Sequence, residues 1–233
     1  MSVFKFKHFQ IVQEHAALKV GTDSMLLGAL CNWENPKRLL DIGTGTGVLA
    51  LMCAQRFPFD EITGIELSEE ACKDAENNAR NNPFPSKIQL INRAIQDYHP
   101  AEAFDAIISN PPFFENSQKN QNEHKALARH TESLSFPELI ASISRLLTPN
   151  GKTWIIVPSE STENILKLAK EHQLFASELI TLFGKPEKST RMILSLVKQE
   201  QEPRSYSLCI RNEDGTYTEE YKILTREFHD REI

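Results

Sequence analysis

Asn110, Pro111, Pro112 and Phe113 stand together in the chain. A proline has no main-chain N–H and keeps the residue before it out of the helical region, so this run predicts a stiff turn with bare carbonyl oxygens. The Asn110 side-chain oxygen and the Pro111 carbonyl oxygen can accept the two hydrogens of one planar amino group. Holding both hydrogens favours a pyramidal nitrogen whose lone pair is aimed at an electrophilic carbon. Phe113 offers a face on which a planar base can stack.

A glycine-rich run lies upstream of this motif and contains Asp41, Gly43, Thr44, Gly45 and Gly47. Small residues there let the backbone turn sharply after a strand and approach a ligand closely. The dinucleotide fingerprint Gly-x-Gly-x-x-Gly does not fit, because its third glycine would fall at position 48, which is a valine. The run predicts a ligand-binding loop of another kind.

Glu66 is the next residue that could contact a ligand. It ends the second predicted strand, 25 residues after Asp41. A carboxylate at such a strand end can accept hydrogen bonds from both ribose hydroxyls of an adenosine. We predict that Glu66 and the neighbouring Leu67 contact a nucleoside.

Strands and helices that alternate along the chain must position these motifs. Short apolar runs predict seven strands, at residues 39–42, 62–67, 88–92, 104–109, 152–157, 177–183 and 191–198. Helices are predicted between them, one capped by Ser68 and one opened by a capping box of Ser135 and Glu138. This alternation implies a mostly parallel sheet with helices on both faces. A ligand should bind at the carboxyl ends of the strands, near the switch point in strand order.

Shorter elements flank the alternating unit. Residues 4–12 alternate and could pair with residues 17–20 ahead of a short helix at 24–31, and residues 206–211 and 216–223 suggest a hairpin around a glycine turn. We therefore expect one domain over residues 1–233. It would comprise an N-terminal appendage (1–34), a binding and catalytic core (35–200) and a C-terminal hairpin extension (201–233).

Composition and charge restrict the class of protein further. The chain has 233 residues and a net charge of −6, and residues 60–76 alone account for that charge. Its longest strictly apolar run, residues 48–54, is far too short for a membrane span, and the N-terminus lacks the apolar block of a secretory signal, so we expect a cytoplasmic protein. The cysteines and histidines show no metal-binding spacing, so no metal is predicted. The sequence leaves the oligomeric state open and is compatible with a monomer.

The glycine-rich run resembles the cofactor loop of S-adenosylmethionine-dependent methyltransferases. The resemblance implies a Rossmann-like class I fold whose last strand is antiparallel. It also implies that the glycine backbone contacts the methionine moiety of the cofactor and that Asp41 orients its ammonium group. Related enzymes often bind the cofactor's adenine amino group with an acid near the third strand, and Ala94 aligns with that position here. Asp97 is then the candidate, with the backbone of Ala94 and Ile95 as the alternative.

Asn-Pro-Pro-aromatic motifs occur in enzymes that methylate adenine N6, guanine N2 or a protein glutamine amide. Four segments of this chain, residues 4–9, 19–28, 110–114 and 217–221, together resemble the bacterial tRNA (adenine-N6)-methyltransferase family that acts beside the anticodon of a valine tRNA. The resemblance implies that Asn110 and Pro111 grip N6 of adenine 37 and that Phe113 stacks on its ring. It also implies that the basic, aromatic N-terminus and the loop after Phe114 help to hold the anticodon loop.

The sequence alone leaves other functions open. A ribosomal RNA guanine-N2 or protein glutamine-N5 methyltransferase would use the same amino-group chemistry. A non-catalytic cofactor-binding module is disfavoured by the complete motif from Asn110 to Phe113, and a nicotinamide dehydrogenase is disfavoured by the glycine spacing.

Overall fold

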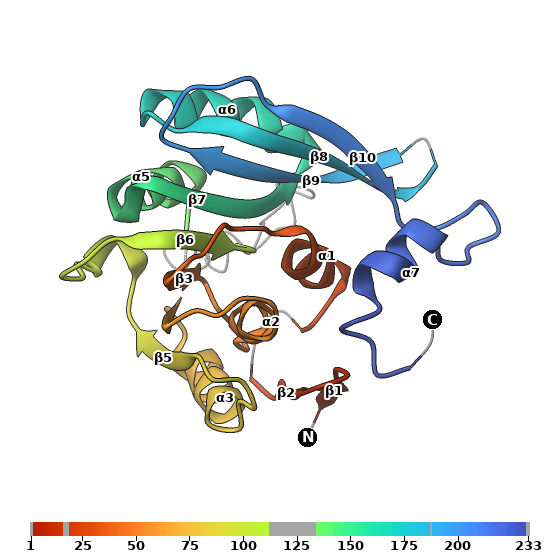
Figure 1. Cartoon of the computed structure of the whole chain (residues 1–233), viewed down its shortest axis with the longest axis horizontal. Helices are drawn as coiled ribbons and strands as arrows, with labels where there is room; N and C mark the ends of the chain where they lie inside the picture. The colour runs from red at the N-terminus through yellow and green to blue at the C-terminus, as the bar shows by residue number, and fades with distance from the viewer. Residues whose placement is uncertain (1, 16–18, 112–133, 187, 232–233) are drawn as a thin grey trace, which may run out of the picture.

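The computed structural model describes residues 2–15, 19–111, 134–186 and 188–231 (Figure 1). Pro112, Phe113 and the loop that follows them lie outside the described residues. The strands are β1 (Val3–Lys5), β2 (Gln10–Val12), β3 (Arg38–Ile42), β4 (Glu61–Glu66), β5 (Lys87–Asn92), β6 (Phe104–Ser109), β7 (Leu147–Pro158), β8 (Phe175–Lys185), β9 (Lys188–Val197) and β10 (Arg204–Cys209). The helices are α1 (Thr22–Leu30), α2 (Val48–Arg56), α3 (Glu69–Arg80), α5 (Phe136–Leu146), α6 (Thr162–Glu171) and α7 (Glu219–Thr225), with short 3-10 turns η1 (Ile95–Asp97) and η2 (Ser159–Ser161).

The main sheet contains eight strands in the order β10-β8-β9-β7-β6-β3-β4-β5. Strands β3 to β7 pair in parallel, and β9 is antiparallel to both of its neighbours, β7 and β8. The predicted strand–helix alternation and the antiparallel last core strand are confirmed. The predicted count of seven is too low, because β10 adds an eighth strand parallel to β8.

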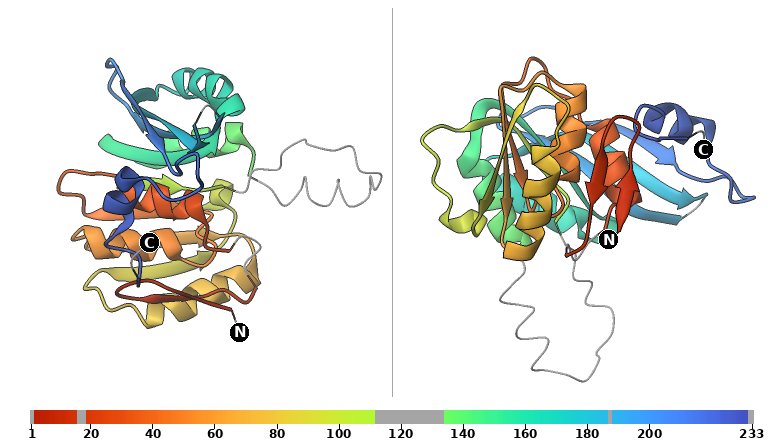
Figure 2. Two further views of the ribbon diagram at one scale, coloured as in Figure 1. Left: turned by 90° about the vertical axis from the view of Figure 1, so that its right-hand side faces the viewer. Right: turned by 90° about the horizontal axis from the view of Figure 1, so that it is seen from below.

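Two apolar cores cover the two faces of this sheet. Along β7, Trp154 and Ile156 belong to the core formed with α1 and α2, whereas Ile155 and Val157 belong to the core formed with α5 and α6. This alternation follows from the two-residue period of a strand, which sends successive side chains to opposite faces. Figure 2 shows the helices arranged on both sides of the sheet.

Chain direction across the sheet reverses between β3 and β6. The chain runs outward from β3 through β4 to β5, and then returns to place β6 on the other side of β3. The loops that follow β3 and β6 therefore diverge and leave a crevice at their carboxyl ends. Both chemical motifs of the sequence follow these two strands, so the fold brings them to one place.

The N-terminal hairpin differs from the predicted one. Strand β1 pairs with β2 inside residues 3–12, with Phe4 opposite Ile11, whereas the prediction paired residues 4–12 with residues 17–20, of which 17 and 18 lie outside the described residues. Phe6 and Phe9 stack with ring centroids 4.3 Å apart, on either side of a turn at Lys7 and His8. Before the turn the apolar residues are at even positions (Phe4 and Phe6), and after it they are at odd positions (Phe9 and Ile11). This change in the alternation marks the position of the turn. In Figure 2 (right) the red hairpin lies beside α3, where Asn78 donates to the Val12 carbonyl oxygen over 2.9 Å.

The C-terminal segment also differs from the prediction, which expected a separate hairpin. Its first arm, β10, joins the main sheet, and the region of its second arm forms the helix α7. The predicted turn is present, with Gly215 at φ +88° and a bridge between Arg211 and Tyr217. Thr218 caps α7 by accepting a hydrogen bond from the Tyr221 N–H, a helix signal that the strand interpretation overlooked.

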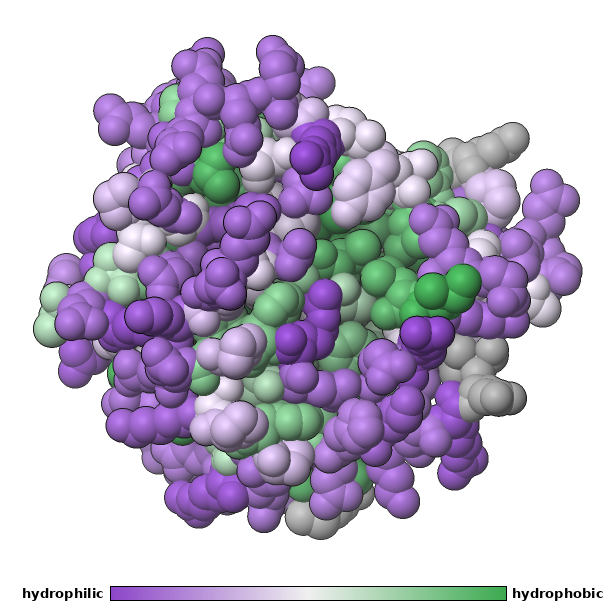
Figure 3. Space-filling view, viewed as in Figure 1, coloured by the Kyte–Doolittle hydropathy of each residue, from purple (hydrophilic) through white to green (hydrophobic). Residues whose placement is uncertain are grey.

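Both ends of the chain pack into the core on the α1 side. Phe6, Leu208, Tyr221 and Phe228 are buried in the same cluster as residues of α1 and α2. Figure 3 shows a mostly hydrophilic face with apolar side chains gathered near its middle, over the region where Figure 1 places α1 beside α7. The division at residues 34 and 200 stays a prediction. In the part of the chain that the structure describes, no helix has the length and apolarity to cross a bilayer.

Candidate active site

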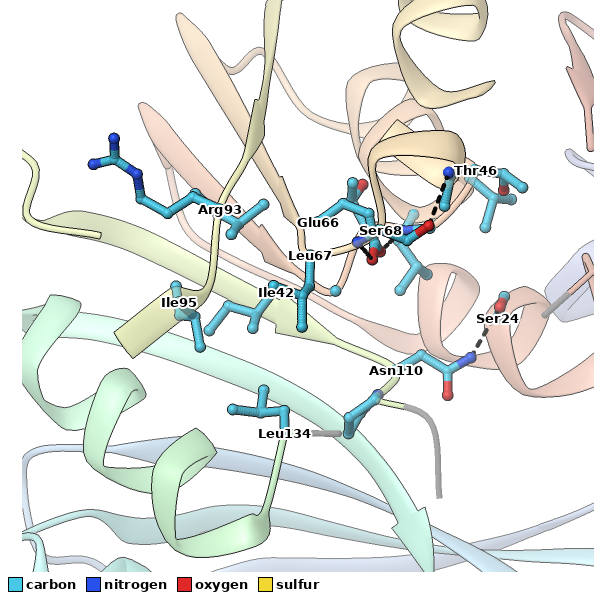
Figure 4. Close-up of a pocket in the computed structure, with 18 of the residues that line it drawn as sticks. Ser24, Ile42, Thr46, Glu66, Leu67, Ser68, Arg93, Ile95, Asn110 and Leu134 are labelled. Carbon is cyan, nitrogen blue, oxygen red and sulfur yellow. Dashed lines mark hydrogen bonds between the residues drawn. The ribbon is translucent and has the colours of Figure 1, made fainter. Parts of the chain in front are cut away.

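A cavity of about 350 Å³ opens at the switch point between β3 and β6. Its walls come from the loops after β3, β4, β5 and β6, together with part of the N-terminal segment. Figure 4 shows side chains from these segments arranged around it, with Glu66 and Ser68 on one side and Asn110 on the other. The volume falls within the usual range for small-molecule sites.

The glycine loop forms one wall of the cavity. Gly43 and Gly45 line it with φ of +69° and +55°, a left-handed conformation that side chains rarely adopt. A Cβ added at either residue would meet no atom within 4 Å. Gly47 also has a positive φ but packs on Ala75 of α3 and lies outside the lining. The loop therefore presents bare backbone to the cavity at two positions, and Gly47 allows the close approach of α3.

Asp41 lies at the end of β3, directly beneath the glycine loop. Its side chain is fully buried, and its Oδ2 accepts a hydrogen bond from the Thr44 hydroxyl over 2.6 Å. Its Oδ1 is buried and has no hydrogen-bond partner at full geometry among the residues that the structure describes. Burial raises the pKa of Asp41 to about 7, although the Thr44 hydroxyl and the Ala50 main-chain N–H oppose that rise. Asp41 does not line the cavity, whose wall begins at Ile42 and Gly43, so its contact with a ligand stays a prediction.

Glu66 is held in place by two main-chain donors. Its Oε2 accepts from the Gly45 N–H and its Oε1 from the Ser68 N–H, both over 2.9 Å. Asn92 of β5 fixes the same turn by donating to the carbonyl oxygens of Glu66 and Leu67. The carboxylate keeps further lone pairs for a ligand. Leu67 lines the cavity and is 51% exposed as a residue, which leaves an apolar surface for a flat ring to cover.

The structure brings Gln96, and not Asp97, to the cavity. Ala94, Ile95 and Gln96 belong to its wall, whereas Asp97 is exposed and outside the lining. The turn of η1 explains the difference, because its tight backbone, closed by a bond from the Asp97 N–H to the Ala94 carbonyl oxygen, sends adjacent side chains in different directions. The alternative prediction, which used the backbone of Ala94 and Ile95, agrees with this geometry.

Asn110 reaches the opposite wall directly after β6. Ser109 ties this strand end to β3 through a hydrogen bond of 2.8 Å to the Ile42 carbonyl oxygen. The Asn110 side chain donates from Nδ2 to the Ser24 hydroxyl of α1 over 3.0 Å, and Pro111 also lines the cavity (Figure 4). Asn110 and Pro111 are thus brought to the glycine loop, as the sequence predicts. Pro112 and Phe113 lie outside the described residues.

Several lining residues come from the N-terminal segment, which the sequence interpretation treated as an appendage. His15, Lys19, Val20 and Ser24 all contribute to the wall. His15 is anchored on α3, where its main-chain N–H and its Nδ1 lie 2.7 Å and 3.1 Å from the carboxylate of Asp74, and this hydrogen bond raises the pKa of His15. These contacts join residues far apart in sequence, so local patterns gave no signal for them.

No group of three or more metal-ligating side chains is found in residues 2–15, 19–111, 134–186 and 188–231. The polar side chains that line the cavity are instead the Glu66 carboxylate, the carboxamides of Gln96 and Asn110, several hydroxyls and the basic groups of His15, Lys19 and Arg93. Such a set suits an organic ligand that carries several hydrogen-bonding groups.

Solved structures share this architecture. A predicted O-methyltransferase from Agrobacterium tumefaciens superposes with a TM-score of 0.68 at 19% identity, covering 88% of this chain and 96% of that one. A methyltransferase from Pyrococcus furiosus superposes with a TM-score of 0.53 at 22% identity, covering 71% and 76% of the two chains. At sequence identities this low, the superpositions show only that the fold is shared. The chain therefore has the α/β fold of class I methyltransferases.

Sequence comparison narrows this class. The family model described as "Methyltransferase small domain" matches residues 5–176. A protein of Pedobacter heparinus, named tRNA1(Val) (adenine(37)-N6)-methyltransferase, is 37% identical over 228 residues, which are 97% of each chain. A protein of Aeromonas hydrophila with the same name is 39% identical over 232 residues, which are 98% of this chain and 97% of the relative. The chain belongs to this family of methyltransferases, and the dehydrogenase alternative is discarded.

The residues present fit S-adenosylmethionine, the cofactor of this family. Gly43 and Gly45 line the cavity without a side chain, so their backbone is open to the methionine moiety. Asp41 lies buried beneath this loop, where its Oδ1 could accept a hydrogen bond from an ammonium group through water. Glu66 and Leu67 offer a hydrogen-bonding carboxylate beside an apolar surface, which matches a ribose joined to an adenine.

Proposed function

We propose that this protein transfers a methyl group from S-adenosylmethionine to N6 of adenine 37 in tRNA1(Val). Full-length relatives that share this name support the proposal. The structural observation that carries it is the position of Asn110, whose carboxamide stands in the same cavity as the glycine loop. A nitrogen acceptor gripped there lies beside the cofactor site.

The chain's own groups activate the amino group. The Asn110 side-chain oxygen and the Pro111 carbonyl oxygen each accept one hydrogen from N6, which draws its lone pair out of conjugation with the ring. The bound cofactor supplies an electrophilic methyl group on a positively charged sulfur. These two acceptors hold the nitrogen more tightly as it becomes pyramidal and positively charged, so they stabilise the transition state more than the ground state. No general base is needed, because the methylated nitrogen is strongly acidic.

Five residues are proposed to hold the cofactor. The Gly43 and Gly45 backbones receive the methionine moiety, and the Asp41 carboxylate pairs with its ammonium group, directly or through water. Glu66 accepts hydrogen bonds from the ribose hydroxyls, which is a charge-assisted interaction. Leu67 covers one face of the adenine.

The proposed RNA target suits such a pocket, because anticodon-loop bases are unpaired or readily turned out of the stack. Phe113 stays the predicted stacking residue for the target adenine. Lys5 and Lys7, exposed on the N-terminal hairpin, are proposed to contact phosphates. A tRNA substrate places the enzyme in the cytoplasm.

A direct test uses total tRNA from a strain that lacks this gene. The purified protein and labelled S-adenosylmethionine should restore N6-methyladenosine, detected by mass spectrometry of nucleosides and located at position 37 of tRNA1(Val). Label in ribosomal RNA as N2-methylguanine, or in a protein glutamine, would contradict the proposal. Failure to transfer label to any RNA or protein extract would indicate a non-catalytic module.

Replacing Asn110 separates chemistry from cofactor binding. In the variant Asn110→Ala, cofactor affinity should stay within about twofold of wild type, because its other contacts remain. Methyl transfer should fall by about 100-fold or more, as when a donor or acceptor aimed at a transition state is removed. Equal loss of affinity and turnover would show that Asn110 serves the cofactor instead.

A further inference from the structure

The helix α1 brings a hydroxyl group to the residue proposed to grip the substrate. Ser24 lies in the first turn of α1, only 7% exposed, and its Oγ is 3.0 Å from Asn110 Nδ2 although 86 positions separate the two residues. Both side chains line the cavity, and Figure 4 shows them facing each other across its edge. Nothing in the sequence pattern pairs them.

This contact anchors one end of the carboxamide and leaves the other end for a ligand. The Asn110 NH₂ group can only donate hydrogen bonds, and its oxygen can only accept them. An amide turns about its last bond between two nearly equivalent orientations. In the structure the Ser24 hydroxyl accepts from Nδ2, so the oxygen, which makes no hydrogen bond with the described residues, is the end left for a ligand. In the reverse orientation the Asn110 NH₂ group would face the amino group of a bound substrate. Both groups donate hydrogen bonds, so neither could accept from the other.

We propose that Ser24 is a positioning residue that holds the Asn110 carboxamide with its oxygen toward the amino group to be methylated. The role rests on the proposed function, because it requires Asn110 to accept a hydrogen from the substrate amine. Ser24 itself touches neither the methyl group nor the amine in this scheme. It contributes by anchoring the carboxamide through Nδ2 before substrate binds.

The attachments of α1 support this role, because a positioning group must itself be fixed. At the N-terminal end, Asp23 forms an ion pair of 2.9 Å with Arg191 of β9. At the C-terminal end, Arg56 of α2 donates to the carbonyl oxygens of Gly28 and Cys31, each over 2.7 Å. The helix is therefore tied to the sheet on one side of Ser24 and to α2 on the other.

The close packing of α1 on α2 fixes it further. A Cβ added at Gly28 would come within 2.6 Å of the Met52 sulfur, so the two helices approach as near as a glycine allows. Shortly after the end of α1 in the chain, the Trp33 indole N–H donates to the Lys152 carbonyl oxygen over 2.7 Å. These contacts leave α1 little freedom to shift along the sheet, and the Ser24 hydroxyl keeps its place beside Asn110.

Steady-state and single-turnover kinetics of the variant Ser24→Ala test the proposal. Loss of one orienting hydrogen bond should lower kcat by about five- to tenfold, while KM for tRNA and the Kd for S-adenosylmethionine change less than about twofold. Ser24→Thr, which keeps the hydroxyl, should restore most of the rate. Ser177→Ala is the matched control, since Ser177 is also buried and hydrogen-bonded, to Ser195 over 2.7 Å, but lies on β8 outside the cavity.

A double-mutant cycle shows whether Ser24 acts through Asn110. In the Asn110→Ala background, Ser24→Ala should reduce the residual rate no further, because the group to be oriented is gone. An equal loss in both backgrounds would overturn the proposal, and so would an unchanged kcat in Ser24→Ala. Weaker cofactor binding in Ser24→Ala would also overturn it, since Ser24 would then be a cofactor ligand.

A wild-type control separates this proposal from the proposed function. A wild-type enzyme inactive on tRNA would refute the function, whereas an active wild type with an equally active Ser24→Ala would refute only the role of Ser24. The orientation itself can be read without turnover from nuclear Overhauser contacts between the Asn110 side-chain NH₂ protons and α1. Contacts in the wild type are expected, and their absence would contradict the assigned orientation.

Discussion

The variant Asp41→Asn isolates the cost of a buried carboxylate in the cofactor site. Burial raises the pKa of Asp41 to about 7 in the folded protein from 3.8 in the unfolded reference. The folded state therefore holds this proton more tightly than the unfolded chain does. The stability that this provides is complete below pH 3.8 and is lost progressively as the pH rises to 7, above which no more is lost.

The size of this effect follows from the two pKa values. Proton linkage gives a loss of about 2 kcal/mol in the wild-type unfolding free energy between pH 5.5 and pH 8. An asparagine does not titrate, so the difference between variant and wild type should move by about 2 kcal/mol in favour of the variant over that interval. Any fixed cost of placing an amide beside Thr44 is the same at both pH values and cancels.

Urea denaturation of the cofactor-free proteins at both pH values measures this difference. Asp97→Asn is the control, because it makes the same substitution at an exposed carboxylate outside the cavity. A variant-to-wild-type difference that stays constant for Asp41→Asn would refute the assignment of a proton to this buried carboxyl. With cofactor present, the ammonium group favours the ionised form, so wild-type affinity should rise nearly tenfold from pH 6 to pH 7.5, and that rise should vanish in the variant.

Two further variants test the other parts of the cofactor site. Glu66→Gln should weaken binding of S-adenosylmethionine by about 10- to 100-fold in calorimetry by removing charge-assisted acceptors, and an unchanged affinity would place Glu66 outside the ribose site. Gly45→Ala should lower both affinity and melting temperature, because Gly45 lines the cavity and its φ of +55° strains any residue with a side chain. Its control, Gly215→Ala with φ +88° in the C-terminal turn, should lower only the melting temperature, and an unchanged affinity in Gly45→Ala would exclude the loop from the binding site.

The parts of the site that sequence predicts are those determined by local backbone geometry. Glycines at Gly43 and Gly45 indicate a left-handed turn directly, and strand ends place Glu66 and Asn110 at one edge of the sheet once the strands are recognised. None of these assignments needs a side-chain contact between distant segments. The family resemblance then supplies the cofactor.

The features that the sequence does not predict depend on contacts between distant segments or on the exact position of a residue within a turn. Ser24 meets Asn110 across 86 positions, and no periodic pattern carries that information. Gln96 replaces Asp97 at the cavity because a one-residue shift within a 3-10 turn redirects a side chain. The strand interpretation of residues 216–223 gave too little weight to Thr218 and the acids after it, a capping sequence that favours a helix.

The net charge of −6 also has a structural explanation that bears on RNA binding. The acidic segment of residues 60–76 occupies β4 and α3, toward the β5 edge of the sheet, whereas Asn110 follows β6 on the other side of β3. Within that segment Glu66 is bonded to the Gly45 loop, and Asp74 is buried against His15. Of the remaining acids, Asp60 and Glu61 stand at the start of β4, and Glu69, Glu70 and Glu76 lie on α3. Ion pairs of Arg38 with Glu61 over 3.3 Å and of Lys73 with Glu69 over 2.6 Å offset part of this charge locally. The acidic segment therefore repels an approaching RNA less than its count of carboxylates suggests, and salt screens what is left over a Debye length of about 8 Å.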